Sequence, residues 1–342
     1  MSDSEINKRN RRSSGGITLH DVARIAGVSP MTASRAINNP DQVSAGLLKK
    51  VEIAIARTGY VPNRMAGGLA SSKSKLIAAI VPSTVMSVFN ETIEALNNSL
   101  FDAGYQLMLG QSAYSSIREE SLLNSVIGRR PDGIFLTGVM PPGKGRTRLV
   151  ASGIPVVETW DLTPTPIDML IGFSHAEIGV AVAKYLMAKS KTKFAIIRAE
   201  DERANRRTTA FVATVVEAGM SPPHIINVGS LRSIKSGRNA MAEILKNAPK
   251  TDAVFCSSDL LAMGALTEAK SQNILVPEQI SIMGFGDVPF LSDLLPSLST
   301  VRINGERIGQ LAAQYLMDRA EGRTVSEPIL NVGFSIMERD TA

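Results

Sequence analysis

The sequence predicts a small all-α head that contains a helix-turn-helix, followed by an α/β body of two doubly wound lobes. Three observations carry this prediction. Basic residues gather at the start of the chain, short capped helices follow one another there, and from Leu76 onward apolar strands alternate with amphipathic helices. With 342 residues, of which 44% are hydrophobic and 20% charged, the chain has enough apolar material for a core, which excludes a disordered or collagen-like protein.

The charge is unevenly distributed along the chain. Residues 1–75 carry twelve Lys and Arg against five Asp and Glu, a net charge of +7, whereas the rest of the chain carries 25 basic and 27 acidic side chains. Such a basic head favours a nucleic acid or another anionic surface as its partner. On charge alone, a solvated basic tail is an equally good interpretation.

Composition also limits the compartment in which the protein works. Cys256 is the only cysteine, which excludes a disulfide framework and a cysteine-based zinc site and fits a reducing compartment. No apolar run is long enough to span a bilayer, and the polar N-terminus MSDSEINKRNRRSSGG has no apolar segment behind it. We therefore expect a cytoplasmic protein with no membrane partner.

The head begins with a tail at residues 1–16 that is predicted to be disordered, because it has no periodicity. A first helix follows, for which Thr18 is placed as the N-cap. Asp21 comes three residues later, which is a capping-box arrangement. Gly27 is expected to end this helix.

A second helix is predicted from Ser29, which caps it, with Pro30 in the first turn, where its missing N–H costs nothing. Residues 38–41, with the sequence NNPD, form a turn. A third helix is expected from about Ser44 and stops before Gly59.

The second helix distinguishes a helix-turn-helix from any other three-helix bundle. Its outer face carries Met31, Thr32, Ser34 and Arg35, which are short, polar or cationic side chains of the kind that a helix entering a DNA groove requires. A purely structural surface helix more often carries Glu/Lys pairs.

Eight apolar runs in the body indicate buried strands. Their starts are mostly 27 to 30 residues apart, the length of a βα unit, with amphipathic helices such as NETIEALNNSLFDAGY between them. The runs are IAAIVP (77–82), YQLMLG (105–110), GIFLTG (133–138), IPVVET (154–159), FAIIRA (194–199), HIINVG (224–229), AVFCSS (253–258) and ISIMGFG (280–286).

Eight βα units fit either two doubly wound lobes or a single (β/α)₈ barrel. The sequence LTPTPIDMLIGFSHAEIG reads as a long loop between the first four strands and the second four. This break favours two lobes.

A ligand in such a body is expected between the lobes, because ligands of parallel sheets bind beyond the carboxyl ends of the strands. Trp160, the only tryptophan, follows a strand; it either stacks on the C–H face of a sugar or fills the interlobe crossover. The candidates that follow strands or begin the next helices are Ser83, Phe89, Asn90, Tyr114, Glu158, Trp160, Asp161, Arg198, Arg207, Ser258 and Asp287.

The segment TLHDVARIAGVSPMTASRAINNP, with GYVPNRMAGGLASSKS behind it, resembles the N-terminal signature and hinge of the LacI/GalR family of bacterial transcriptional regulators. The resemblance covers the chain from about Ile17 onward. It implies that Thr32 and Ser34 contact DNA phosphates. Arg35 and Met31 are then expected at base edges in the major groove. The DNA contacts that the resemblance implies are Thr18, Ser29, Met31, Thr32, Ser34, Arg35, Asn38, Asn63, Arg64 and Leu69.

The hinge in this resemblance contains a leucine, Leu69, that family members wedge into a minor-groove step. Gly67 and Gly68 lie just before it and cost about 2 kcal/mol of helix propensity relative to alanine. We therefore expect a hinge that is disordered without DNA and folds when it binds.

The resemblance further implies a body like that of periplasmic sugar-binding proteins, with three crossovers between its two lobes. A late helix, NGERIGQLAAQYLMDRAEG, is expected to return to the first lobe, and a last strand near 329–336 to end in the second. The expected domains are a tail (1–16), a helix-turn-helix domain (17–62), a hinge (63–75), a first lobe (76–172 with about 302–324) and a second lobe (173–301 with about 325–342).

Family positions also indicate an effector site. Phe173 stands where an aromatic ring packs on effectors, and Arg207 stands where an effector-binding arginine occurs. Ser258 replaces a common asparagine, and Gly286 stands where many sugar-binding members carry an aspartate. Loss of that carboxylate with retention of Arg207 favours an anionic ligand. The expected effector contacts are Ser83, Phe89, Tyr114, Glu158, Trp160, Phe173, Arg207, Ser258 and Asp287.

The gluconate-repressor branch of the family is the most similar, through MTxSR in the second helix, VVE after IP, GF at 172–173, DER at 201–203 and VFC at 254–256. This implies a sugar acid such as gluconate or a ketogluconate as the effector. A neutral sugar stays possible, since Arg207 can instead pair internally with Glu158 or Asp201.

The sequence thus predicts a repressor that binds a pseudo-palindromic DNA operator as a homodimer, responds to a small effector and needs no cofactor. We expect a dimer because the chain ends at Ala342 without a leucine-heptad tail. A solute-binding protein for uptake is the alternative, disfavoured by the basic head and the missing export signal. An α/β enzyme is disfavoured by the absence of G-x-G-x-x-G, P-loop and G-x-S-x-G motifs.

Overall fold

The computed structural model describes residues 17–61, 73–83, 88–113, 115–229 and 232–342. The chain divides into two compact units, residues 1–74 and 75–342, each of which is described by itself. The predictions that lie outside the described residues are those for the tail at 1–16, the folding of the hinge, Asn63, Arg64, Leu69 and Tyr114.

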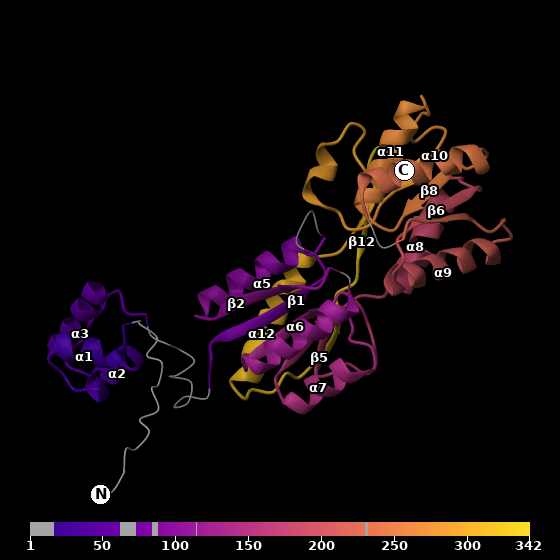
Figure 1. Cartoon of the computed structure of the whole chain (residues 1–342). Helices are drawn as coiled ribbons and strands as arrows, with labels where there is room; N and C mark the ends of the chain where they lie inside the picture. The colour runs from indigo at the N-terminus through magenta and orange to yellow at the C-terminus, as the bar shows by residue number, and fades with distance from the viewer. Residues whose placement is uncertain (1–16, 62–72, 84–87, 114, 230–231) are drawn as a thin grey trace, which may run out of the picture. The chain divides into compact units, whose positions relative to one another are not determined.

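The head unit contains three packed helices (Figure 1). Small buried side chains meet where the helices cross, among them Val22, Ala36 and Ala54, so that short helices can approach closely around a small core. The elements are α1 (Leu19–Ala26), α2 (Pro30–Asn38), the short 3₁₀ helix η1 (Pro40–Gln42) and α3 (Ala45–Thr58).

Local capping rules set the helix boundaries of the head. The Thr18 N–H donates to Asp21 Oδ2 at 3.0 Å and the Asp21 N–H donates to Thr18 Oγ1 at 3.4 Å, which is the predicted capping box. Gly27 ends α1 in the left-handed region, with φ +67°. Ser29 Oγ accepts the Thr32 N–H at 3.1 Å and so caps α2. The predicted starts of the first two helices are confirmed.

The first lobe of the body contains a six-stranded parallel sheet in the order β11-β5-β4-β3-β1-β2. Most of its strands are buried on both faces, as parallel sheets require. The strands are β1 (Leu76–Val81), β2 (Gln106–Gln111), β3 (Gly133–Thr137), β4 (Val156–Thr159), β5 (Met169–Gly172) and β11 (Ile329–Asn331).

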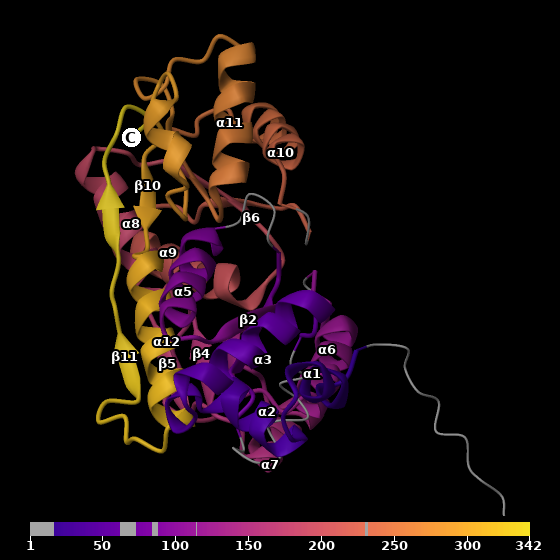
Figure 2. The same ribbon diagram turned by 90° about the vertical axis from the view of Figure 1, so that its left-hand side faces the viewer.

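The second lobe contains a four-stranded parallel sheet in the order β7-β6-β8-β9, and a separate antiparallel pair, β10 with β12, runs beside it. Figure 2 shows β10 and β12 lying side by side, with α12 following β10 along the chain. The strands are β6 (Phe194–Arg198), β7 (His224–Asn227), β8 (Ala253–Cys256), β9 (Ser281–Met283), β10 (Thr300–Arg302) and β12 (Ser335–Met337).

Helix pairs cover both faces of each sheet, which makes both lobes doubly wound and excludes the single barrel. Alternate strand residues face opposite helix pairs: Ile196 packs toward one pair and Ile197 toward the other. The pairs are α5 (Asn90–Asp102) with α12 (Gly305–Ala320), α6 (Ser116–Gly128) with α7 (Lys144–Ser152), α8 (His175–Ala188) with α9 (Glu202–Glu217), and α10 (Ile234–Asn247) with α11 (Asp259–Ser271).

All eight predicted strands are present, but two expectations about the connections are wrong. The sequence expected as a long loop contains β5, a fully buried strand that joins the first sheet beside β4. The strand expected near 329–336 is two strands, β11 and β12. Because β11 pairs with β5 in the first sheet, the chain returns to the second lobe after Asn331 and not near residue 325.

Candidate functional site

The outer face of α2 is an exposed polar surface of the head. Met31 is 73% exposed, and the Arg35 guanidinium has no hydrogen-bond or ion-pair partner in the described part of the chain. The hydroxyl groups of Ser29 and Thr32 form a hydrogen bond of 2.9 Å, and Asn38 Nδ2 donates to Ser34 Oγ at 3.3 Å. These short polar side chains are thus ordered around one exposed cation, an arrangement suited to a DNA groove.

The body has a cavity of about 380 Å³ between its two lobes, within the usual size of a small-molecule site. We call it the first chamber. Its walls are the segments that follow strands β1, β2, β4, β8 and β9, together with the N-terminal half of α9. Ligand sites of open parallel sheets occur at these carboxyl ends.

One wall of the first chamber is aromatic. Trp160 lies edge-on to Phe89, with ring centroids 4.9 Å apart, and edge-on to Phe173 at 5.6 Å. The indole Nε1–H of Trp160 donates to Thr92 Oγ1 of α5 at 3.2 Å, which fixes the orientation of the ring. Trp160 and Phe89 line the chamber, whereas Phe173 is fully buried behind them and does not.

Arg207 of α9 lies at the base of the first chamber and is only 4% exposed. Its Nη2 donates to Ser257 O at 3.1 Å, and its guanidinium carbon lies 3.9 Å from the centre of the Phe285 ring. Burial lowers the pKa of Arg207 to about 9, so the guanidinium remains cationic at neutral pH. Gly179 of α8 permits this position, because a Cβ there would lie 2.2 Å from the Arg207 carbonyl oxygen.

His175 carries the remaining contact of this guanidinium. Burial, with the nearby Arg207 as a second cause, lowers the pKa of His175 far below its ordinary range, so the imidazole is neutral. Its Nδ1 therefore accepts from Arg207 Nη1 at 2.8 Å, and its Nε2–H donates to Trp160 O at 3.1 Å. The cation and the aromatic wall are joined through one imidazole ring.

A second group of charges lies at the start of α9. Asp201 caps the helix by accepting the Ala204 N–H at 2.9 Å and forms an ion pair with Arg232. Although burial raises the pKa of Asp201, the Arg232 guanidinium and the Ala204 N–H outweigh it and lower the pKa overall. Arg203, in the first turn of α9, has its guanidinium carbon 5.6 Å from the centre of the Phe89 ring across the cleft.

Asp259, the first residue of α11, is a buried carboxyl group in the wall of the first chamber. It accepts the Thr300 hydroxyl at 2.6 Å and the Val288 N–H at 3.2 Å. Burial raises its pKa to about 6 despite these hydrogen bonds. A Cβ at Gly286 would lie 2.8 Å from Asp259 Oδ2, so Asp259 occupies the space in which a side chain at position 286 would begin.

A second chamber, of about 550 Å³, adjoins the first and shares Pro82, Asp201, Arg203 and Arg232 with it. Its wall on the first lobe includes Asp161, which forms an ion pair with Arg206 of α9. The two lobes are therefore linked by charge on this side of the cleft.

Comparison with known proteins agrees with this architecture. The family model described as bacterial regulatory proteins, lacI family, matches residues 18–63, and the periplasmic binding protein-like domain matches residues 183–342. The HTH-type transcriptional regulator GntR of Pseudomonas aeruginosa is 37% identical over 337 residues, covering 98% of each chain. The chain belongs to the lacI family of bacterial regulatory proteins.

Further lacI-family relatives agree. The HTH-type transcriptional regulator GntR of Escherichia coli K12 is 31% identical over 319 residues, covering 93% of this chain and 96% of the relative. The crystal structure of a LacI-family transcriptional regulator from Silicibacter pomeroyi matches with a TM-score of 0.89 at 31% identity, covering 95% of this chain and 99% of that chain. The protein is thus a DNA-binding transcriptional repressor of the lacI family with an effector-binding body.

The structure of this lacI-family repressor brings part of the predicted effector set together. The predicted residues that line the first chamber are Ser83, Phe89, Trp160, Arg207 and Ser258. Three others do not. Phe173 stands behind the aromatic wall, and Glu158 and Asp287 have their carboxylates occupied elsewhere in the protein.

Glu158 is fully buried inside the first lobe. Its carboxylate accepts the Met140 and Ile167 N–H groups, both at 2.7 Å, and burial raises its pKa. It fixes two loops and does not face the ligand cavity, so the prediction that it contacts an effector is wrong. Arg207 forms no hydrogen bond or contact ion pair with Glu158 or Asp201. Its hydrogen-bond partners are His175 and Ser257, while the charge of Asp201 acts to raise its pKa.

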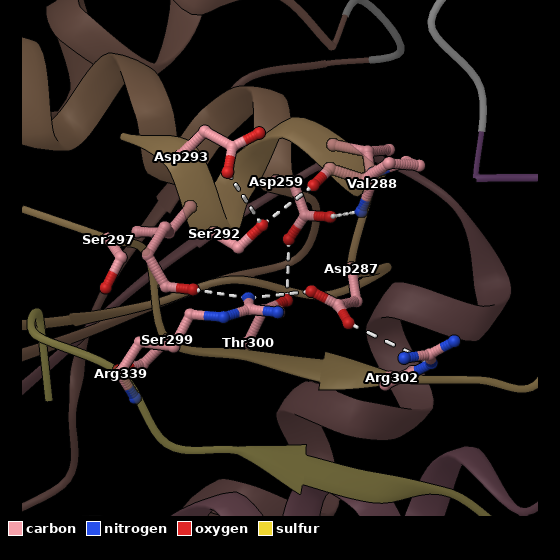
Figure 3. Close-up of polar contacts among 12 residues, drawn as sticks. Asp259, Asp287, Val288, Ser292, Asp293, Ser297, Ser299, Thr300, Arg302 and Arg339 are labelled. Carbon is pink, nitrogen blue, oxygen red and sulfur yellow. Dashed lines mark hydrogen bonds and ion pairs between the residues drawn. The ribbon is translucent and has the colours of Figure 1, made fainter. Parts of the chain in front are cut away.

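Asp287 has a left-handed backbone, with φ +59°, which turns its side chain away from the first chamber. Figure 3 shows it between Arg339 and Arg302. Arg339 Nη1 lies 2.7 Å from its Oδ1, and Arg302 Nε lies 4.0 Å from its Oδ2. Asp287 thus anchors two crossover segments, and its prediction as an effector contact is wrong.

Sequence reasoning missed several residues of the first chamber. Arg203 lies four residues before Arg207 and therefore on the same helical face, which is a signal that could have indicated it. Asp201 and Asp259 stand at helix starts after buried strands, where acidic residues cap helices and also face clefts. Arg232 and Phe285 carried no sequence signal. The wall residues that were not among the expected effector contacts are His175, Asp201, Arg203, Arg232, Asp259 and Phe285.

Among the described residues, no helix is both long enough and apolar enough to cross a membrane.

Proposed function

We propose that this repressor is controlled by a small sugar acid, such as gluconate or a ketogluconate, bound in the first chamber. One observation carries the proposal: guanidinium groups face an aromatic wall in a cavity of sugar size. Aromatic rings stack on the C–H faces of sugars, and guanidinium groups bind carboxylates. Similarity to proteins named GntR and to the gluconate-repressor branch supports the same choice.

In the head, we propose that the outer face of α2 reads the operator. Arg35 is the best placed side chain for a guanine contact, and Met31 is the most exposed apolar one. The further proposed contacts are Thr18, Ser29, Thr32, Ser34 and Asn38, with Asn63, Arg64 and Leu69 in the hinge. A homodimer in the cytoplasm, bound to a pseudo-palindromic operator, fits a head that reads one half-site.

Ligand control requires that the effector and the operator favour different arrangements of the protein. The coupling is reciprocal: if gluconate weakens operator binding tenfold, the operator must weaken gluconate binding by the same factor. A ligand that tightens DNA binding obeys the same rule with the opposite sign.

The experiment has two parts. Genomic fragments retained by the full-length protein in a gel shift supply the operator duplex. Gluconate, 2-ketogluconate and neutral sugars are then titrated calorimetrically into the protein with and without this duplex, and with a scrambled duplex as the control. We expect the acids to bind, the operator to change their affinity, and the scrambled duplex to leave it unchanged. Tight binding of neutral sugars and none of the acids would overturn the sugar-acid proposal.

A further inference from the structure

Three arginines line the first chamber, and two of them already form hydrogen bonds or an ion pair within the protein, although the buried Nε of Arg207 has no hydrogen-bond partner among the described residues. The Arg207 guanidinium contacts His175, Ser257 O and the Phe285 ring. The Arg232 guanidinium forms an ion pair with Asp201. Moving either group toward a ligand would leave a buried partner without its hydrogen bond, which is costly.

Arg203 is different. Among the described residues its guanidinium forms no hydrogen bond and no ion pair at contact distance, although its charge acts to lower the pKa of both Glu119 and Asp201. It lies over the Phe89 ring, with 5.6 Å between the guanidinium carbon and the ring centre. It also lines both chambers, so it stands where they meet. A carboxylate can bind it in the planar, bidentate way without breaking an existing ion pair.

The charges of the two chambers differ in sign. In the first chamber, Arg203, Arg207 and Arg232 face Asp201 and Asp259, a net charge of +1 when both carboxylates are ionised. The second chamber is lined by five carboxyl groups and three guanidinium groups, and therefore repels anions. Its charged residues are Glu119, Asp161, Glu200, Asp201, Glu202, Arg203, Arg206 and Arg232.

The first chamber also offers a free partner for ligand hydroxyls. Ser258 lies at the start of α11, and its Oγ is buried without a hydrogen-bond partner in the described part of the chain. A buried hydroxyl in that state is costly unless a ligand or water satisfies it. The polyol part of a sugar acid can do so within the first chamber.

We propose that Arg203 binds the carboxylate of the effector at the junction of the two chambers, and that the body selects monoanionic, unphosphorylated sugar acids. This inference rests on the sugar-acid function proposed above and deepens it. A net charge of +1 matches one carboxylate. A phosphate group adds about two further negative charges, which would face the acidic second chamber or the buried Asp259.

The test uses calorimetric titration of the full-length protein with gluconate, with sorbitol, which has a hydroxymethyl group in place of the carboxylate, and with 6-phosphogluconate. We expect wild-type protein to bind gluconate at least about tenfold more tightly than either of the other two. Arg203→Gln is expected to lose this preference and bind gluconate no better than sorbitol. Arg203→Lys keeps the positive charge but cannot bind a carboxylate through two parallel N–H groups, so it is expected to keep part of the preference for gluconate.

Arg238→Gln is the matched control, because Arg238 pairs with Glu268 on the α10–α11 surface and lines neither chamber. It is expected to bind all three probes as wild type does, and thermal unfolding of every variant checks its fold. Gluconate selectivity that persists in a folded Arg203→Gln protein overturns the role of Arg203. Equal or tighter wild-type binding of 6-phosphogluconate or sorbitol overturns the selection rule. If wild type binds no sugar acid, the proposed function fails first, and this inference with it.

Discussion

The guanidinium Nη1 of Arg207 lies 2.8 Å from Nδ1 of His175, and both side chains are at least 96% buried. A cation that is taken out of water needs a neutral acceptor or an anion nearby. Here the acceptor is an imidazole whose other nitrogen bonds to the Trp160 carbonyl oxygen. The base of the cleft and its aromatic wall therefore form one hydrogen-bonded unit.

Replacing His175 with alanine tests this unit. His175→Ala leaves the buried Arg207 Nη1 and the Trp160 carbonyl oxygen without partners, so we expect the free energy of unfolding to fall by about 1–3 kcal/mol. Urea denaturation measures the loss. His224→Ala is the control, since His224 on β7 is half-buried and its Nε2 has no hydrogen-bond partner among the described residues. A control that loses as much as His175→Ala would contradict the argument.

Asp259 makes a prediction about pH. Its pKa is raised from 3.8 to about 6 in the folded protein, so the folded state holds this proton more tightly than the unfolded chain. Its contribution to the free energy of unfolding is therefore fully present below about pH 4 and is lost as the pH rises through about 6. A shift of two pKa units corresponds to about 3 kcal/mol.

The measurement compares wild type with Asp259→Asn by urea denaturation at several pH values. The variant lacks this titration, so its free energy of unfolding is expected to rise relative to wild type between about pH 4 and pH 7. Asp201→Asn is a contrasting control. Because the pKa of Asp201 is lowered, the free energy of unfolding of wild type is expected to rise relative to that variant as the pH rises. A wild-type minus Asp259→Asn difference that stays constant with pH would show that Asp259 does not titrate in this range.

The sequence predicted the head better than the cleft, because local patterns define the head whereas long-range contacts define the cleft. Thr18 and Asp21 form their capping box within one turn of helix, so the pattern alone defines it. Glu158 lies within the buried strand β4, whereas Trp160 directly follows it. The partners of Glu158, however, are backbone groups at Met140 and Ile167, which no local pattern connects to it.

The missed features of the body have the same cause. The buried strand Met169–Gly172 is only four residues long, and a run of that length gives no period by which to separate a strand from a loop. Asp287 was expected in the cleft because it follows a strand. Its carboxylate instead pairs with Arg339 and lies 4.0 Å from Arg302, and no local pattern connects either residue to it.

Gly179 tests how the position of Arg207 is fixed. A Cβ at residue 179 would lie 2.2 Å from the Arg207 carbonyl oxygen, so Gly179→Ala must push α9 away from α8. We expect a loss of about 1–3 kcal/mol in the free energy of unfolding, together with weaker gluconate binding. Gly128→Ala is the matched control, because a Cβ at that end of α6 meets no atom within 4 Å. If both variants unfold alike, close helix packing at Gly179 is not the reason for its small side chain.

Arg35 tests how the head reads DNA. Any cation lost from the head weakens binding through phosphate electrostatics, and this loss does not depend on base sequence. A side chain that contacts a base also carries sequence preference. Arg35→Ala is therefore expected to cost about 1–3 kcal/mol on the operator and to flatten the preference at one base pair of each half-site.

Arg57→Ala, an exposed cation on α3, removes the same charge and is the matched control. Fluorescence anisotropy with the operator and with single-base variants of it separates the two effects. Arg57→Ala is expected to weaken binding to all duplexes by one common factor, because an electrostatic contact does not read bases. If Arg35→Ala also scales all affinities equally, its guanidinium contacts the phosphate backbone, and another residue of α2 reads the base.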